Sequence, residues 1–145
     1  MAVTDDQVAT LRAYLVGDFA THERLRDQLD PSAAASGYSA LLAAAFCVAV
    51  ERRFSGEDSL PAVIEFVGAV RSRSEGLSGK IDPRIAERLI RAVYTDETTD
   101  DIDRESRIRT RFLLLAALVV DEMLDDAGLD AFLGESRKLA DQWLS

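Results

Sequence analysis

Two uncharged stretches of the sequence constrain the fold more than any other feature. Residues 40–50 (ALLAAAFCVAV) and residues 112–120 (FLLLAALVV) contain no charged side chain. Both are rich in alanine and leucine, which favour helix, and both are shorter than the roughly 18 apolar residues that a membrane-spanning helix needs. A helix that is apolar on all sides is buried on all sides. The sequence therefore predicts two central core helices, over 37–54 and 101–126, which pack against each other.

Apolar residues at three- and four-residue spacing predict a long first helix over 4–29. Thr4 and Gln7 have the spacing of a capping box at its start. The apolar stripe stays in phase across Gly17, so we expect one continuous helix. The inward-facing stripe consists of Val8, Leu11, Leu15, Phe19, His22, Leu25 and Leu29.

Three further amphipathic helices are predicted along the chain. One covers about 59–74, one starts at Asp82-Pro83, and one follows Gly128, with Trp143 expected to hold the C-terminus against the body. The segment 74–80 (SEGLSGK) carries two glycines and predicts a loop. No stretch shows the alternating pattern of a strand. We therefore expect an all-α, single-domain bundle of about six helices over 1–145, with two fully apolar central helices.

Charge and residue counts exclude several classes of function. The net charge of −9 argues against nucleic-acid and anionic-membrane binding, because the average field repels phosphate. One cysteine and one histidine are too few for structural zinc or a di-iron bundle, and we expect no cofactor. The N-terminal MAVTDDQ lacks the basic residues of a signal peptide, so we expect a cytoplasmic protein.

Four acidic residues crowd the predicted C-terminus of the 101–126 helix: Asp121, Glu122, Asp125 and Asp126. The helix dipole disfavours anions there, and like charges four residues apart repel each other. One interpretation is a site for a hard cation such as Mg²⁺ or Ca²⁺, or a docking patch for a basic partner. The other is a solvated helix end, balanced by an arginine from elsewhere in the fold.

The single histidine, His22, lies on the inward stripe of the first helix. Asp18 precedes it by four residues and would share its helix face. Such a pair could form a general base oriented by a carboxylate, or half of a metal site. The alternative is a hydrogen-bonded histidine at the edge of the core.

Arginines concentrate in the middle of the chain. Arg84, Arg88 and Arg91 share one face of the helix that starts at Asp82-Pro83. This face could bind phosphate groups or an acidic partner. The many acidic residues nearby would instead neutralise it and make it a salt-bridged surface.

The sequence contains no recognisable catalytic constellation, and it has more apolar helix surface than six short helices can hide. We therefore expect a noncatalytic protein-interaction or regulatory module that self-associates as a homodimer. The alternative is a protein that binds a small ligand or a divalent cation, possibly an enzyme, with its site in the bundle near His22. Nucleic-acid binding through the arginine faces ranks third.

Overall fold

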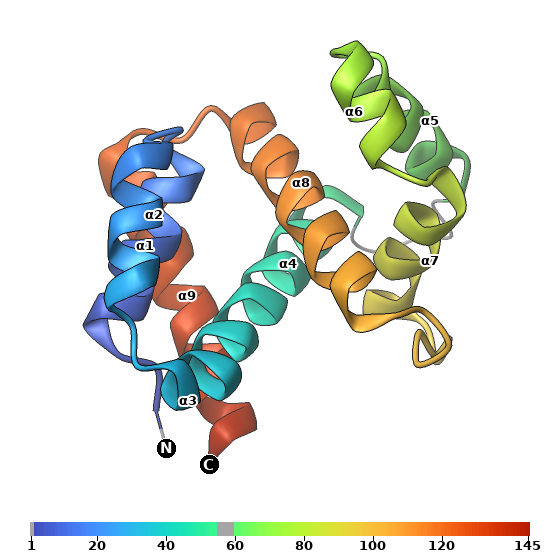
Figure 1. Ribbon diagram of the computed structural model, residues 1–145. Helices are drawn as coiled ribbons and strands as arrows, with labels where there is room; N and C mark the ends of the chain where they lie inside the picture. Colours follow the sequence, from blue (N-terminus) through green and yellow to red (C-terminus); the bar gives the residue numbers. More distant parts are fainter. Residues whose placement is uncertain (1, 55–59) are drawn as a thin grey trace. The chain divides into compact units, whose positions relative to one another are not determined.

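The part of the chain that the structure describes is all-α (Figure 1). This computed structural model describes residues 2–54 and 60–145, apart from the side chains of residues 33–35. Every regular element in these ranges is helical, so the prediction of an all-α protein is confirmed. The elements are α1 (Asp5–Leu15), α2 (Phe19–Gln28), α3 (Pro31–Ala33), the π-helix η1 (Ala34–Tyr38), α4 (Ser39–Phe54), α5 (Leu60–Arg71), α6 (Glu75–Lys80), α7 (Pro83–Tyr94), α8 (Arg104–Glu122) and α9 (Asp126–Leu144).

The chain divides into two compact units. Unit 1 comprises Met1–Val48 and Val119–Ser145, and unit 2 comprises Ala49–Leu118. The divisions fall within α4 and α8, so each of these helices contributes residues to both units.

Unit 1 is organised around α1, which contacts α2, η1 and α9. The predicted capping box is confirmed: the Gln7 N–H donates to Thr4 Oγ1 at 3.2 Å, and the Thr4 N–H donates to Gln7 Oε1 at 3.1 Å. The Arg137 guanidinium of α9 donates to the Val3 carbonyl at 2.7 Å, and the Val3 N–H donates to Asp141 Oδ1 at 2.7 Å. These bonds fix the start of α1 against α9.

The prediction of one helix over 4–29 is wrong. α1 ends at Leu15, and Gly17 adopts a left-handed conformation with φ of +81°. The Asp18 carboxylate then accepts a hydrogen bond from the Thr21 N–H at 3.2 Å and caps the start of α2. This break changes the direction of the chain, so Phe19 is 60% exposed instead of facing the core as the stripe predicted.

Unit 2 contains α5, which packs on α6 and α7. The predicted helix start at Asp82-Pro83 is confirmed, because the Asp82 carboxylate accepts hydrogen bonds from the first turn of α7. The prediction of a loop over 74–80 is wrong: the Ser74 hydroxyl accepts from the Leu77 N–H at 3.1 Å and caps the short helix α6. A capping serine followed by Glu75 in the first turn was enough to start a helix despite two glycines.

The two apolar stretches lie in α4 and α8. Every residue of 40–50 is buried or half-buried. α8 is shorter than the predicted helix, because it begins after Asp103, which accepts from the Ser106 N–H, and it ends at Glu122. The packing of these two helices on each other remains a prediction. None of the helices in the described ranges has the length and apolar character needed to cross a membrane.

Two predictions for the C-terminal helix are wrong. α9 already begins at Asp126, so Gly128 lies in its first turn and does not separate it from the preceding helix. Trp143 is 49% exposed and so does not hold the C-terminus against the body.

Candidate functional site

The acidic cluster of residues 121–126 does not lie on one helix. Asp121 and Glu122 end α8, whereas Asp125 caps α9 and accepts from the Gly128 N–H at 2.7 Å. Asp126 in the first turn of α9 pairs with Arg12 at 3.4 Å. Asp125 and Asp126 therefore lie at a helix N-terminus, where the dipole favours anions, and the predicted like-charge pairs along one helix do not form.

The described residues do not form the set of ligands that the cation-site hypothesis requires. Across residues 2–54 and 60–145, no group of three or more His, Cys, Asp or Glu side chains has an arrangement that could hold a metal ion.

Exposed apolar side chains gather beside this acidic cluster. Phe19 is 60% exposed, Met123 is 88% exposed, and Val16 and Val120 are each more than half exposed. We call these four residues the apolar end surface. Val16 and Phe19 flank the turn between α1 and α2, and Val120 and Met123 flank the end of α8.

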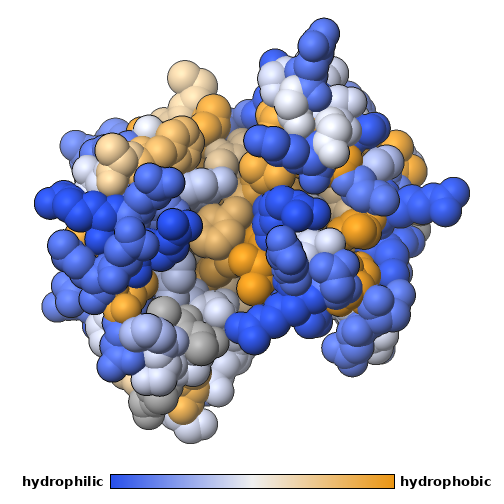
Figure 2. Space-filling model, viewed as in Figure 1, coloured by the Kyte–Doolittle hydropathy of each residue, from blue (hydrophilic) through white to orange (hydrophobic). Residues whose placement is uncertain are grey.

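Both turns lie at the same end of unit 1 (Figure 1). Arg12 in the last turn of α1 contacts Asp126 at 3.4 Å and Asp130 at 3.0 Å, both in the first turns of α9. This pairing holds the end of α1 beside the start of α9. Figure 2 shows apolar side chains gathered at this end of unit 1, next to strongly hydrophilic ones.

Met123 occupies an unfavourable backbone conformation. Its φ is +53°, in the left-handed region where glycine is the usual residue after a helix. A residue with a Cβ atom is less stable there by about 1–2 kcal/mol. The chain thus has a strained residue whose large apolar side chain contributes almost nothing to the core.

His22 lies inside unit 1 in an aromatic cluster. Its side chain is buried, and its Nε2 atom lies 3.3 Å from the Tyr38 hydroxyl. The Tyr14 ring lies between His22 and Phe19, with ring centroids 5.3 Å and 5.8 Å away. Burial lowers the pKa of His22 from its ordinary value, and nearby Arg26 lowers it further.

Asp18 has a different role from the one predicted. It caps α2, and the hydrogen bonds from Thr21 lower its pKa. The His22 ring instead lies within hydrogen-bond distance of the Tyr38 hydroxyl, a contact that sequence spacing did not suggest. The arrangement is that of a hydrogen-bonded histidine in the interior of unit 1.

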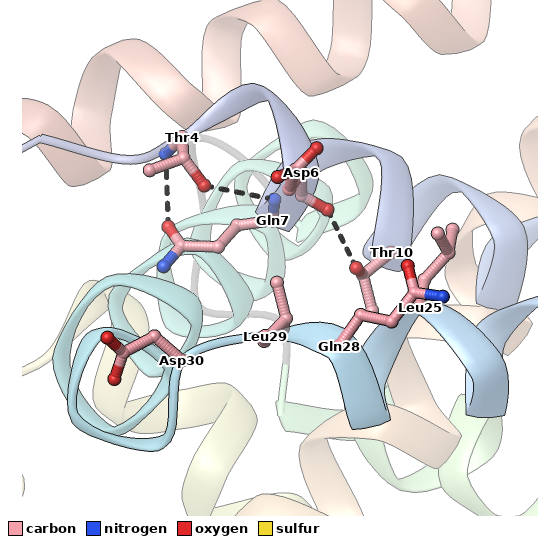
Figure 3. A pocket seen from close by; sticks show the side chains of 8 residues that line it. All are labelled: Thr4, Asp6, Gln7, Thr10, Leu25, Gln28, Leu29 and Asp30. Carbon is pink, nitrogen blue, oxygen red and sulfur yellow. Dashed lines mark hydrogen bonds between the residues drawn. The ribbon is translucent and has the colours of Figure 1, made fainter.

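A cavity of about 320 Å³ opens between α1, α2 and residue 30 (Figure 3). Three of its polar side chains have partners within the chain: Thr4 and Gln7 form the capping box, and the Thr10 hydroxyl donates to the Asp6 carbonyl at 2.7 Å. In Figure 3 the ends of Gln28 and Asp30 point away from each other. Its lining residues are Thr4, Asp6, Gln7, Thr10, Leu25, Gln28, Leu29 and Asp30, without His22.

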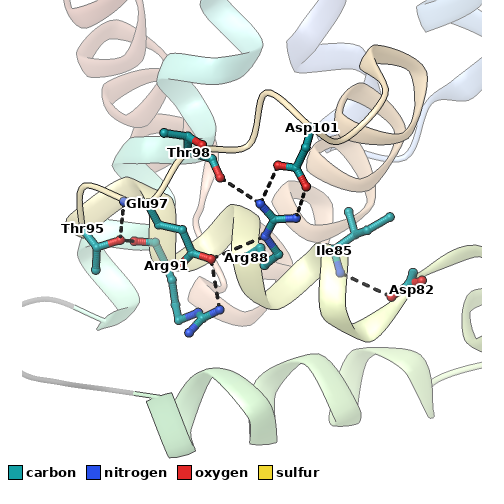
Figure 4. Close-up of polar contacts among 8 residues, drawn as sticks. All are labelled: Asp82, Ile85, Arg88, Arg91, Thr95, Glu97, Thr98 and Asp101. Carbon is teal, nitrogen blue, oxygen red and sulfur yellow. Dashed lines mark hydrogen bonds and ion pairs between the residues drawn. The ribbon is translucent and has the colours of Figure 1, made fainter.

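The arginine face of α7 is engaged in ion pairs within unit 2 (Figure 4). Arg88 donates to both carboxylate oxygens of Asp101, at 2.7 and 2.8 Å, and to the Thr98 carbonyl at 2.9 Å. This contact lowers the pKa of Asp101 to about 2. Arg91 pairs with Glu97 at 3.3 Å. The geometry is that of a salt-bridged surface.

Arg84 lies at the exposed start of α7. It is one turn away from Arg88, which is committed to Asp101 and Thr98. The predicted phosphate-binding face therefore does not present three available guanidinium groups.

Comparison with known proteins adds no assignment, because no family model matches the chain and neither the curated proteins nor the solved structures give a significant match.

Proposed function

We propose that this chain is a noncatalytic protein-interaction module, of a regulatory or self-associating kind. The observation that carries the proposal is the apolar end surface of unit 1. Transfer of one such side chain from water to an apolar contact contributes about 1.5–3 kcal/mol. Four of them at one end of a small unit are therefore a substantial reason to bind another protein chain.

The residue types at this surface support the proposal. Methionine and aromatic residues are enriched at protein interfaces, and methionine adapts its shape to different partners. Met123 also retains a strained backbone that a glycine would relieve. Strain of this kind clusters at functional sites, where it is retained in spite of its cost to stability.

The alternative function, a small ligand or a divalent cation bound near His22, has weaker support. His22 is buried beside Tyr38 and does not line the cavity between α1 and α2. Thr4, Gln7 and Thr10, which line that cavity, form hydrogen bonds within the first turns of α1. A bound ligand would have to displace these contacts first.

Site-specific photocrosslinking tests the proposal directly. A photoreactive amino acid replaces Met123 in the full chain, in the cells that produce it, and crosslinked products are identified by mass spectrometry. The matched control carries the same group at Ile64, which is 49% exposed on α5 of unit 2. We expect a discrete protein product from position 123 and none, or a different one, from position 64.

The same experiment separates the two forms of the function. A product that contains two copies of this chain supports self-association, and a product with another protein supports a regulatory or adaptor role. Identical products from positions 123 and 64, or no product from position 123, would contradict an interaction at the apolar end surface.

A further inference from the structure

We infer that the apolar end surface binds a cationic amphipathic segment of another protein: a helix with an apolar stripe flanked by lysine or arginine. This inference rests on the proposed function and adds the chemistry of the partner. It follows from the charge that surrounds the surface.

The first step is the distribution of charge between the units. Unit 1 has 13 Asp and Glu residues against 5 Arg and Lys residues, a net charge of −8, whereas unit 2 has 13 against 12, a net charge of −1. Nearly all of the net negative charge of the chain therefore belongs to unit 1.

The second step is the position of these charges at the apolar end surface. The two turns that form this end, residues 16–19 and 120–126, contain five Asp and Glu residues and no Arg or Lys. Asp18 lies between Val16 and Phe19 in the chain, and Asp121 and Glu122 lie between Val120 and Met123. Every apolar side chain of the surface is thus a near neighbour of a carboxylate.

Two arginines act on the carboxylates at this end: Arg24 adds to the hydrogen bonds from Thr21 in lowering the pKa of Asp18, and Arg12 acts at α9. Arg12 reaches this end from α1 and pairs with both Asp126 and Asp130. One guanidinium for two carboxylates leaves a negative excess even at α9. We call Asp18, Asp121, Glu122, Asp125 and Asp126 the acidic rim.

The third step weighs against a symmetric contact between two copies at this surface. In a two-fold dimer the same patch meets itself, so two acidic rims would face each other across a closely packed contact. Like charges juxtaposed in this way oppose association. A segment with cations on both sides of an apolar stripe instead matches the apolar residues and the rim together, which is the usual way an amphipathic helix is recognised.

A designed peptide probe tests this inference on the full chain. The probe is a Leu/Lys peptide of about 18 residues, five turns of amphipathic helix. Two controls are a Leu/Glu peptide with the same pattern and a Leu/Lys peptide of the same composition with the stripe scrambled. Fluorescence anisotropy measures binding at about 50 mM and about 300 mM salt, which differ several-fold in screening.

We expect saturable binding of the amphipathic Leu/Lys peptide that weakens at the higher salt concentration, and at least about tenfold weaker binding of both control peptides. Phe19→Ser and Met123→Gly should each weaken binding about tenfold or more, because each removes a large side chain from the contact. Glu122→Gln should weaken it by about two- to fivefold and reduce its salt dependence. Ile64→Ser, the matched control in unit 2, should leave binding unchanged.

Met123→Gly also separates binding from folding. Glycine adopts the φ of +53° without strain, so this variant should be at least as stable as the wild type. A loss of binding in a fully folded Met123→Gly protein cannot be attributed to unfolding.

Three results would overturn the inference. The first is binding of the Leu/Glu or scrambled peptide that is as tight as binding of the probe. The second is unchanged binding by the surface variants. The third is a second copy of this chain as the crosslinked partner at position 123. The last result leaves the proposed function intact and only replaces the partner. If the proposed function itself is wrong, position 123 gives no specific crosslinked product.

Discussion

The two units of this chain carry the same number of acidic residues and differ in their cations. Unit 2 has 12 Arg and Lys residues for its 13 Asp and Glu residues, and several of them form short ion pairs between neighbouring segments, as Arg88 does with Asp101. Unit 1 has only 5 for its 13. The net charge of the whole chain is therefore the sum of a nearly neutral unit and a strongly anionic one, and the anionic unit contains the apolar end surface.

The interiors of the units differ as well. Unit 1 buries several polar side chains, among them Gln7, Thr10, His22 and Ser136. Buried polar groups need partners, so they fix side chains and backbone in specific positions.

The largest expected effect is the truncation of a core aromatic residue in unit 1. Phe132 on α9 is fully buried, so Phe132→Ala should lower the free energy of unfolding by about 3–5 kcal/mol. Leu89→Ala is the matched truncation in α7 of unit 2, with an expected loss of about 2–5 kcal/mol. Denaturant unfolding measures the losses, and hydrogen exchange shows where they act. We expect Phe132→Ala to deprotect α1 and α9 first; equal deprotection of α5 and α7 would show that the two units open as one.

Substitution of alanine for one glycine in each unit should have smaller effects on stability, of opposite sign. A Cβ atom at Gly37 of η1 would lie 2.6 Å from Gln7 Oε1, and Gln7 is buried and held in the capping box. Gly37→Ala should therefore destabilise the protein by about 1–3 kcal/mol. Gly68 on α5 has open space around it, so Gly68→Ala should stabilise by about 0.5–1 kcal/mol. Thermal unfolding of both variants checks the opposite signs, and a neutral Gly37→Ala would show that Gln7 moves aside freely.

The buried histidine gives unit 1 a specific dependence on pH. Burial, together with Arg26, holds the pKa of His22 below its ordinary value of 6.5, so the unfolded chain binds the proton more tightly than the folded one. Its contribution to stability is complete above pH 6.5 and decreases as the pH falls below that value. NMR titration of the imidazole measures this pKa. Wild type should lose more stability than His22→Asn between pH 7 and pH 5, and identical losses would contradict the expectation.

In unit 2, the ion pair between Arg88 and Asp101 also makes stability depend on pH, but at a lower pH than His22 does. Arg88 lowers the pKa of Asp101 from 3.8 to about 2. The stability that this carboxylate contributes is therefore present above pH 3.8 and is lost as the pH falls towards 2. The effect is small because Asp101 is exposed and water screens the ion pair. Wild type and Asp101→Asn should differ slightly in stability at pH 6 and converge near pH 2; a difference that persists at pH 2 would contradict the role of the ion pair.

Sequence patterns predicted those parts of the fold that depend on local chemistry. The capping box of Thr4 and Gln7 and the helix start at Asp82-Pro83 were both predicted, because the side chains that cap these helices are adjacent in the chain. The break at Gly17 was missed because the apolar stripe stays in phase across it. The Gly17-Asp18 pair was the available signal, since glycine commonly follows one helix and aspartate begins the next.

The candidate site was harder to predict for a physical reason. The four acidic residues were recognised, but their division between α8 and α9 depends on Met123 adopting a left-handed conformation. That conformation normally calls for glycine or asparagine, so methionine gives no signal for a break. The gathering of Val16 and Phe19 with Met123 depends in turn on contacts between segments more than 100 residues apart, such as Arg12 with Asp126.

Methyl NMR of the methionines tests the interaction at the apolar end surface most directly. The chain has two methionines, Met1 and Met123, so a ¹³C-methyl-labelled sample gives two signals, and Met123→Gly assigns them. On addition of the amphipathic Leu/Lys peptide, we expect the Met123 signal to shift with a saturable dependence on peptide concentration, and the Leu/Glu peptide to leave it in place. An unchanged Met123 signal under conditions where the Leu/Lys peptide binds the protein would show that the peptide binds elsewhere, and would contradict the role of this surface.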